Sequence, residues 1–500
     1  FELGDDTVNV TLAAGENVVC VFTNTQESSI TIVKDVIGTD GVFNFGSMAL
    51  GSFAIDTAVN DTESFSNLLF GQFMVAETPV PMGYSLTDIT CSGGSDVTIG
   101  AAGGFDPGDT GVSINLAPGE DVICTFQNTE LGSITVAKET LPDGSTESFS
   151  FTGDAAGTIN DGGTIAVTNL LPGQYSSIET VPAGWDLTDI TCDDASSATP
   201  SNGDVGSATA TFNVETGEDV TCTFTNTQQA TVNVVKLVVN DDGGNANVTD
   251  FLIGTSIDSL TFGPGVPVDA DTTSYTATLT GVVPGTGYRV VEIDVTGYTE
   301  GTWACTDAGG ANVGGGPFDN GLFDVAPGSV VTCTITNDDI APTLTLIKSV
   351  TNDNGGNAGP DDFGISVDGN VVLSGSVTPV AANTPIAIDE AGLTGYTFDS
   401  ITGDAKCPAV LGGTVTLDEG ENVTCTITND DVAPTLTLIK SVTNDNGGNA
   451  GPDDFGISVG GNVVASGATI AYDGLYDSAD EADDESGEYF LSVAGEAKGG

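Results

Sequence analysis

Hydrophobic and polar residues alternate along most of this chain. Strand-forming residues occupy every second position, and clusters of Gly, Pro, Asn and Asp interrupt them roughly every eight to twelve residues. In the segment ITVAK, for example, Ile134, Val136 and Lys138 share one face of a strand, because successive side chains point to opposite sides. No stretch has a convincing amphipathic helical period, so the pattern predicts an all-β protein.

A short pattern recurs along the chain and indicates its organisation. A strand that contains a cysteine ends in asparagine, and a lysine follows ten or eleven residues later. Five of the seven lysines hold this position, at successive distances of 104, 98, 112 and 92 residues. This spacing is that of a small domain, which is long enough to bury its own core. The five are Lys34, Lys138, Lys236, Lys348 and Lys440.

Units of about 100 residues with this rhythm of short strands are typical of β-sandwiches. We therefore predict a tandem array of small β-sandwich domains with an immunoglobulin-like architecture. Residues 1–26 are expected to end a unit whose beginning precedes Phe1. Four complete repeats and an incomplete fifth with an acidic tail follow, at residues 27–130, 131–229, 230–339, 340–431 and 432–500.

Three polar residues of each complete repeat share a strand face with apolar residues, so the alternation directs them inward. They are the lysine, the asparagine and a glutamate midway between them. A buried unpaired charge loses several kcal/mol of solvation, so the placement is costly unless the three meet. Two explanations remain open: a buried ion pair with an amide partner, or a neutral amine that attacks the carboxamide while the glutamate moves a proton. The glutamates are Glu77, Glu179, Glu292 and Glu390, and the asparagines are Asn128, Asn226, Asn337 and Asn429.

Nine cysteines follow the same repeats. Each complete repeat holds two, which favours one disulfide per domain and an oxidising compartment outside the cytoplasm. Buried free thiols are the weaker alternative, and a zinc site is disfavoured because the chain lacks histidine and a CxxC motif. Cys20 is left over, and we expect its partner to lie before Phe1. The predicted pairs are Cys91–Cys124, Cys192–Cys222, Cys305–Cys333 and Cys407–Cys425.

The formal charge of −63 argues against nucleic acid and anionic membrane surfaces as partners. Most acidic residues are scattered through turns, as on a well-solvated surface or one adapted to high salt. The segment Asp473–Glu488 differs, because eight of its sixteen residues are acidic; we predict that it is disordered or begins a further element. No signal peptide or transmembrane run is visible, so no membrane insertion is expected within this segment.

The glutamates lie in a recurring box. LPGQYSSIETVPAGW, residues 171–185, is its fullest version, with the glutamate between an aromatic residue and a Gly-aromatic pair. Together with the lysine on the first strand and the asparagine on the last, the box resembles the collagen-adhesin B-type domains of Gram-positive pilins and adhesins. The resemblance covers residues 27–431 and both partial ends. It implies a prealbumin-like (transthyretin-like) sandwich.

In those domains lysine and asparagine form a spontaneous intramolecular isopeptide bond with help from the acidic residue. The resemblance therefore implies that this chain has four such cross-links. They are Lys34–Asn128 with Glu77, Lys138–Asn226 with Glu179, Lys236–Asn337 with Glu292, and Lys348–Asn429 with Glu390.

The chain departs from that family pattern in its last two complete repeats. Thr296 and Thr394 replace the proline of the box, and Ile386 replaces its first aromatic residue. Asp389, next to Glu390, makes the assisting acid of the fourth repeat ambiguous. A disulfide that reaches the last strand is also untypical of the pilin domains. Such a disulfide could stabilise the domain alone, so the alternative is that lysine, glutamate and asparagine are only hydrogen-bonded and form no cross-link.

Loops rich in asparagine, aspartate and glycine follow three of the lysine strands. Their closely spaced oxygen atoms suit calcium, and the candidate ligands are Asp241, Asp242, Asp353 and Asn354. The alternative is a hairpin turn, since Asn-Gly and Asp-Gly pairs form turns and no glutamate closes a twelve-residue calcium loop. The loops are NDDGGNANVTDF from Asn240, NDNGGNAGPDDF from Asn352, and its copy from Asn444.

These patterns predict a structural stalk or adhesin segment of a secreted or cell-surface protein. Isopeptide formation occurs once and acts on the chain itself, so no enzyme is expected, and no cofactor apart from the calcium alternative. Two other interpretations remain open. One is a set of adhesin domains that bind an extracellular carbohydrate or protein, on a host or neighbouring cell; the other is an acidic calcium-binding surface-layer or matrix protein. No repeat shows an exposed aromatic platform, and Trp185 and Trp303 belong to the repeated framework.

Overall fold

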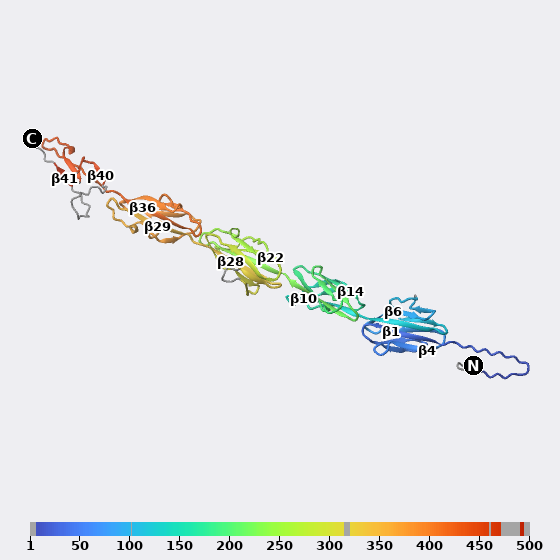
Figure 1. Ribbon diagram of the computed structural model, residues 1–500. Helices are drawn as coiled ribbons and strands as arrows, with labels where there is room; N and C mark the ends of the chain where they lie inside the picture. Colours follow the sequence, from blue (N-terminus) through green and yellow to red (C-terminus); the bar gives the residue numbers. More distant parts are fainter. Residues whose placement is uncertain (1–6, 102, 315–320, 460–461, 472–490, 495–500) are drawn as a thin grey trace. The chain divides into compact units, whose positions relative to one another are not determined.

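The computed structural model of the chain is built from strands joined by turns and loops, and its first described strand begins at Ser28 (Figure 1). Among the described residues the only helical segments are three 3-10 turns, and none is long and apolar enough to cross a membrane. The prediction of an all-β chain is therefore confirmed. The acidic stretch Asp473–Glu488 lies outside the described residues, which are 7–101, 103–314, 321–459, 462–471 and 491–494.

The first repeat is a sandwich of two sheets. Its strands are β1 (Ser28–Ile37), β2 (Val42–Gly46), β3 (Phe53–Asp56), β4 (Thr62–Leu68), β5 (Gly71–Glu77), β6 (Tyr84–Ser92), β7 (Val97–Ile99), β8 (Gly111–Leu116) and β9 (Asp121–Glu130). One sheet has the order β4-β1-β9-β6 and the other β3-β2-β5-β8-β7. The first and last strands, β1 and β9, are parallel neighbours in the middle of their sheet, whereas their outer neighbours are antiparallel to them.

The second repeat follows the same plan. Its strands are β10 (Gly132–Leu141), β11 (Phe149–Gly153), β12 (Gly157–Ile159), β13 (Thr164–Leu170), β14 (Gly173–Thr180), β15 (Trp185–Cys192), β16 (Asn202–Asp204), β17 (Thr209–Val214) and β18 (Asp219–Gln228). The sheet orders are β13-β10-β18-β15 and β12-β11-β14-β17-β16. The first and last strands are again parallel neighbours.

In the third repeat the two faces join into one continuous sheet. Its elements are β19 (Ala230–Val239), η1 (Val248–Asp250), β20 (Leu252–Thr255), β21 (Val266–Pro267), β22 (Thr272–Val282), β23 (Gly285–Ile293), β24 (Tyr298–Glu300), β25 (Ala304–Asp307), β26 (Asn312–Gly314), β27 (Leu322–Val325) and β28 (Val330–Asp339). The order is β20-β23-β27-β26-β25-β28-β19-β22-β21, with β24 beside β28. β19 and β28 are parallel, so the central pair is retained.

The fourth repeat returns to two separate sheets. Its elements are β29 (Thr343–Thr351), η2 (Pro360–Asp362), β30 (Gly364–Val367), β31 (Asn370–Val371), β32 (Val377–Pro379), β33 (Ile386–Ala391), β34 (Tyr396–Gly403), β35 (Gly413–Val415) and β36 (Asn422–Asp431). The orders are β32-β29-β36-β34 and β31-β30-β33-β35. β29 and β36 form the parallel pair.

The described part of the fifth repeat has fewer pairings. Its elements are β37 (Thr435–Thr437), η3 (Pro452–Asp454), β38 (Gly456–Val459), β39 (Asn462–Val464), β40 (Thr469–Ala471) and β41 (Leu491–Ala494). β37 pairs with β40, and β38 lies between β39 and β41.

The alternation in the sequence becomes the division between core and surface. Along β10, Ile134, Val136 and Lys138 are buried and the residues between them are partly exposed. Phe151 and Phe224, one from each sheet, meet edge to face with ring centroids 5.1 Å apart. Burial of such apolar surface drives folding at roughly 25 cal/mol per Å². Each complete repeat has a hydrophobic core of this kind, which confirms the predicted array of small β-sandwiches.

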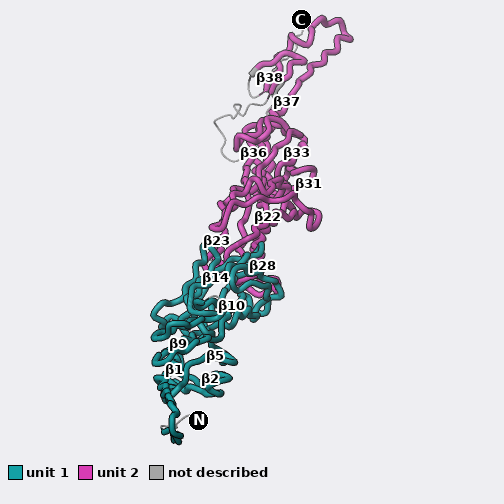
Figure 2. Tube along the Cα trace, turned by 90° about the vertical axis from the view of Figure 1, so that its right-hand side faces the viewer, with its two compact units in different colours: residues 1–229 teal, residues 230–500 magenta. Residues whose placement is uncertain are grey.

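The chain divides into two compact units, residues 1–229 and 230–500 (Figure 2). The first unit contains β1 to β18 and the second contains β19 to β41. The boundaries predicted for the individual repeats remain predictions.

Candidate functional site

The recurring lysine and asparagine lie on neighbouring strands. In the second repeat Lys138 of β10 is in register with Phe224 of β18, and Asn226 lies two positions further along the same strand face. Because each first strand pairs in parallel with the last, the same register recurs in the other complete repeats. All eight side chains are buried. The other pairs are Lys34 and Asn128, Lys236 and Asn337, and Lys348 and Asn429.

The glutamate of each complete repeat reaches the same place from a different segment. It lies on β5, β14, β23 or β33, opposite an apolar residue of the adjacent strand. The side chains of Glu179 and Glu292 are fully buried, as is Glu77, and that of Glu390 is 1% exposed. The fold therefore brings together three polar residues from distant parts of the sequence inside an apolar core.

In the second and fourth repeats the lysine amine contacts the carboxamide directly. Nζ of Lys138 lies 2.8 Å from Oδ1 of Asn226, and Nζ of Lys348 lies 2.6 Å from Oδ1 of Asn429. In the fourth repeat the carboxylate of Glu390 also lies 2.8 Å from the amine, and its Oε1 accepts a hydrogen bond of 2.6 Å from the asparagine Nδ2. All three groups are therefore in mutual contact there.

In the third repeat the glutamate lies between the lysine amine and the asparagine carboxamide. Oε2 of Glu292 lies 2.8 Å from Nζ of Lys236, and Oε1 accepts a hydrogen bond of 2.5 Å from Nδ2 of Asn337. This arrangement fits an acid that exchanges protons with both partners.

In the first repeat the amine is held by the backbone. Nζ of Lys34 donates to the carbonyl oxygens of Phe126 and Asp35 at 2.6 and 2.8 Å, while Nδ2 of Asn128 donates to Glu77 at 2.6 Å. The carboxamide and the acid are thus paired, and the amine lies next to them.

Several polar atoms of these sites lack a hydrogen-bond partner among the described residues. They are buried, and an unpaired buried polar atom costs about 1–3 kcal/mol. The clusters are therefore not fully satisfied hydrogen-bond networks. The atoms are Oδ1 of Asn128 and Asn337, Nδ2 of Asn226, Oε2 of Glu77, and both carboxylate oxygens of Glu179.

Burial favours the neutral form of the lysine amine in each complete repeat. It lowers the pKa of Lys34 and of Lys138 to about 8 from 10.5, although the nearby carboxylates act in the opposite direction. Burial likewise lowers the pKa of Lys236 and Lys348. A neutral amine has the free electron pair that a nucleophile needs.

The acids of the first two repeats shift in the complementary direction. Burial raises the pKa of Glu77, against the effect of the Asn128 hydrogen bond, and it raises the pKa of Glu179, against the effect of the Lys138 charge. A raised pKa favours the protonated carboxyl group, which is the form that can donate a proton to a leaving group.

A phenylalanine covers the lysine amine in all five repeats. The Nζ atom lies 3.9 Å from the ring centroid in the third repeat and 4.2 to 4.6 Å from it in the others. The ring face attracts the ammonium form, and the ring excludes water from the amine. The residues are Phe43, Phe149, Phe251, Phe363 and Phe455.

The aromatic residue that ends the glutamate box holds this phenylalanine in place. The two rings pack edge to face, with centroids 5.3 to 5.5 Å apart. This contact gives the box aromatic a physical role in each complete repeat. The residues are Tyr84, Trp185, Tyr298 and Tyr396.

Sequence reasoning assigned no role to the phenylalanine. It follows the lysine by 9, 11 or 15 residues, so its position varies with the length of the intervening loop. The signal is present in NDDGGNANVTDF, which ends at Phe251, but alternation along one strand does not predict what lies beyond a loop.

The structure distinguishes the two candidate acids of the fourth repeat. Glu390 contacts the lysine, whereas the neighbouring Asp389 is exposed on the opposite strand face. Ile386, which stands where the box has an aromatic residue, is buried in the core. The replacement therefore keeps the apolar strand face on which Glu390 lies.

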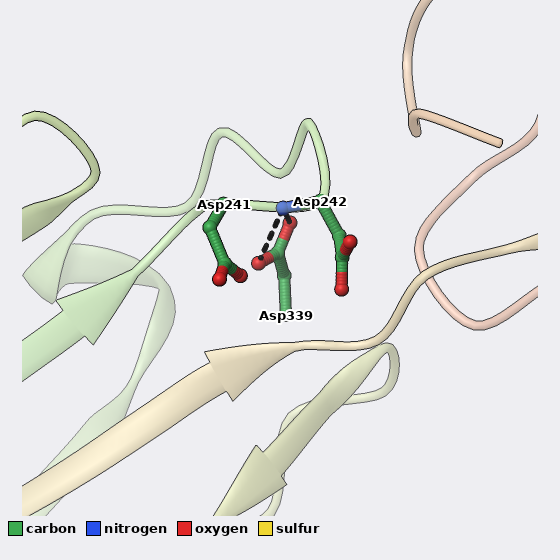
Figure 3. A group of neighbouring side chains, drawn as sticks. All are labelled: Asp241, Asp242 and Asp339. Carbon is green, nitrogen blue, oxygen red and sulfur yellow. Dashed lines mark hydrogen bonds between the residues drawn. The ribbon is translucent and has the colours of Figure 1, made fainter. Parts of the chain in front are cut away.

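Two acidic clusters lie at the ends of the last strands in the third and fourth repeats. Asp241, Asp242 and Asp339 place carboxylate oxygens within 4.8 Å of one another (Figure 3). Asp353 groups in the same way with Asp430 and Asp431. These clusters include three of the four predicted calcium ligands; the fourth, Asn354, lies beside the second cluster.

The central aspartate of each cluster is already bound by the loop backbone. The carboxylate of Asp339 accepts N–H groups of Asp242 and Gly244, the former at 3.1 and 3.2 Å (Figure 3). Asp431 accepts N–H groups from Asp353, Asn354 and Gly356 in the same manner. Amide N–H groups directed at a carboxylate hold the turn closed.

The pKa values of two aspartates in the second cluster shift in opposite directions. Burial acts to raise the pKa of Asp431, but the three backbone hydrogen bonds outweigh it and hold the pKa below its usual range. Burial, together with Asp353 and Asp431, raises the pKa of Asp430. Asp431 therefore anchors the loop, whereas the charged form of Asp430 is disfavoured by repulsion from the neighbouring carboxylates.

Each complete repeat also contains a disulfide that ends on the last strand. Three of them join paired strands: Cys91–Cys124, Cys192–Cys222 and Cys305–Cys333. The fourth, Cys407–Cys425, joins β36 to the loop after β34. Cys20 is exposed and has no disulfide partner among the described residues. The last strand is thus flanked by the lysine strand on one side and by the disulfide on the other.

We predict that replacing Asp431 by alanine releases the loop from Asn352 to Ala358. The backbone N–H groups lose their acceptor, at a cost of about 1–3 kcal/mol. Hydrogen-exchange mass spectrometry should show faster exchange in this loop. Asp430→Ala is the matched control, because it removes a repelled carboxylate without touching those N–H groups. Equal exchange in the two variants would contradict the anchoring role.

Profiles described as SpaA-type prealbumin-like fold domains match residues 2–26, 30–130, 134–228, 227–335, 339–427 and 431–499. No curated protein sequence matches the chain. These segments together cover most of the chain.

Solved structures give weaker likenesses. The Bacillus anthracis TIE protein is 14% identical, with 81% of this chain and 69% of that protein covered and a TM-score of 0.28. SpaC, a pilus adhesin from Lactobacillus rhamnosus GG, is 12% identical, with coverages of 73% and 56% and a TM-score of 0.23. BcpA, the major pilin subunit of Bacillus cereus, is 9% identical, with coverages of 63% and 100% and a TM-score of 0.22. At such values the structures add no argument, and it is the profile matches that show that the chain belongs to the SpaA-type prealbumin-like fold domains.

Proposed function

We propose that this chain is a tension-resisting stalk segment of a surface or secreted protein, in which each complete repeat closes itself by a Lys–Asn isopeptide bond. One observation carries the proposal. In four repeats a buried lysine, asparagine and glutamate cluster at the junction of the first and last strands. An ion pair alone does not require the asparagine, and it leaves several buried polar atoms unpaired.

The proposed reaction balances without any further reagent. The neutral lysine Nζ attacks Cγ of the asparagine, and a C–N bond forms. The glutamate takes a proton from Nζ and delivers a proton to Nδ2, the Cγ–Nδ2 bond breaks, and ammonia leaves. The product is one secondary amide, and the glutamate ends in the protonation state in which it began. Each site reacts once, so the chain is not an enzyme.

The surroundings of the lysine favour this chemistry. Burial lowers the pKa of the lysine amine and raises that of the glutamates in the first two repeats. The covering phenylalanine keeps water away from the amine, so solvent does not compete for it. The parallel register holds amine and carboxamide within reach, which supplies the proximity that such a reaction needs.

The parallel pairing of the first and last strands explains why a Lys–Asn bond would resist tension. Since β1 and β9 are parallel, the chain enters at one end of the pair and leaves at the other, and a pulling force shears the two strands. A bond between Lys34 and Asn128 would carry the force directly from one strand to the other. The segment between them, including the Cys91–Cys124 disulfide, would then bear no load.

The disulfides of the complete repeats support an extracellular location. Intradomain disulfides persist in oxidising compartments. Within the SpaA-type prealbumin-like fold family, such a chain would serve in a pilus-like or adhesive assembly on a cell surface, with an extracellular ligand or a neighbouring cell as partner. An acidic calcium-binding protein remains the second candidate, favoured by the two aspartate clusters.

The rate of cross-linking should depend on pH. In chain recovered unfolded from inclusion bodies and then refolded, ammonia loss in the first two repeats should rise as pH passes through about 8, because the amines of Lys34 and Lys138 must lose a proton. The rate at pH 6.5 should be roughly fifteenfold below that at pH 8, because the neutral fraction of an amine with a pKa of about 8 falls from about one half to about 3% over this range. Time-resolved peptide mass spectrometry measures it. A rate independent of pH would refute the neutral-amine mechanism.

The mechanical role can be tested by single-molecule extension of the whole chain. In Lys34→Met the first repeat has no cross-link, and about 70 residues outside the disulfide loop are free to extend by a step on the order of 200 Å. Methionine retains the apolar stem, and Asn128 and Glu77 remain paired with each other.

The wild-type chain should show no such step in its complete repeats. Lys406→Met, which removes a partly exposed lysine of the fourth repeat that lies outside the buried cluster, is the matched control and should behave as wild type. A step of the same length in wild type, or its absence in Lys34→Met, would overturn the proposed role.

A further inference from the structure

The first repeat carries a hollow on the outer face of its second sheet. Its volume is about 830 Å³, which is within the range of small-ligand and side-chain binding sites. The hollow lies over β2, β5 and β8, on the side away from the buried lysine, asparagine and glutamate. It is therefore separate from the proposed cross-link, and the two can be tested independently.

The floor of the hollow consists of three residues with almost no side chain. Gly46 of β2 is in register with Ala76 of β5, and Ala76 is in register with Gly111 of β8. A Cβ added at Gly111 would lie 2.8 Å from the Cβ of Ala76, so a larger residue there would crowd this row. Three adjacent strands thus leave a trench across the sheet.

Two long, flexible apolar side chains line the trench. Met48 is fully exposed, Met74 is 63% exposed, and both line the hollow. The whole chain contains only three methionines, and the third, Met82, also lies in this repeat but does not line the hollow. Methionine side chains make favourable contacts with aromatic rings and adjust to the shape of a partner.

The equivalent position in the second repeat is filled. There the register places Thr152, Ile178 and Thr209 side by side across β11, β14 and β17. Because the two repeats share one strand order, the trench is a departure of the first repeat from the common framework and not a consequence of the fold.

The charge around the trench indicates the charge of the partner that would bind there. Asp109 lines the hollow, and the only basic residue of the first repeat is Lys34, which is buried. An acidic surface without exposed cations attracts positive charge and repels negative charge. A partner with an aromatic residue for the trench and basic residues beside it matches both features.

We infer that the trench of the first repeat is a docking site for a cationic, aromatic-bearing segment of another protein. An aromatic side chain lies on the Gly46–Ala76–Gly111 floor between the two methionines. Basic residues beside the aromatic side chain face Asp109, which lines the trench.

The test uses the whole chain labelled with ¹³C at the methionine methyl groups, which gives three signals in an NMR spectrum. The probe is the pentapeptide KKWKK, with KKAKK and EEWEE as comparison peptides. KKWKK should shift the signals of Met48 and Met74 in a saturable manner and leave that of Met82 in place. KKAKK and EEWEE should have at least tenfold weaker effects.

Two variants locate the site. Ala76→Leu fills the trench and should weaken KKWKK binding at least tenfold, whereas Ile178→Leu, at the same register position of the second repeat, should leave it unchanged. Met48→Ser replaces a fully exposed side chain, so it cannot disturb the core, and should weaken binding severalfold.

Several outcomes would overturn the inference. They are the absence of a saturable shift, equal responses to KKWKK and EEWEE, and equal effects of Ala76→Leu and Ile178→Leu. Shifts of Met48 and Met74 that depend on the concentration of the chain without peptide would assign the trench to a second copy of the chain instead.

Discussion

The parallel pairing of the first and last strands is the constraint on which the rest of each repeat depends. It places a lysine and an asparagine two positions apart on one inward face, in the same register in four repeats. Burying such groups in a small apolar core is costly. The glutamate, the covering phenylalanine and the aromatic residue that supports it are best understood as the surroundings that make this burial tolerable and chemically useful.

The remaining stabilising features converge on the last strand. Its cysteine forms a disulfide, and where both cysteines lie in strands the disulfide is on the side away from the lysine strand. In the third and fourth repeats the aspartate at the end of the last strand also anchors the loop that leads to the phenylalanine. A disulfide is worth roughly 2–4 kcal/mol. With the proposed amide on its other side, the last strand would be covalently held on both flanks, and the repeat could not unzip from its end.

Much of this arrangement was predictable because it rests on alternation within single strands. Ile134, Val136 and Lys138 reveal their common face in the sequence, and so do Cys222, Phe224 and Asn226. The role of Phe251 was not predictable, since a loop of variable length separates it from Lys236. The aspartates of the loops suggested calcium, but only the structure reveals the amide groups bound to Asp339. The trench needs the register of three strands, which brings Gly46, Ala76 and Gly111 together from distant positions.

The most direct test of the central claim is the intact mass of the folded chain, measured before and after reduction. Each isopeptide bond removes one ammonia, about 17 Da, and each disulfide removes two hydrogens, about 2 Da. The account predicts a deficit equal to four ammonias that survives reduction, in addition to the deficit from the disulfides. A reduced mass equal to that calculated from the sequence would contradict it, and the buried lysines would then be ion-pair partners in a stalk held by disulfides alone.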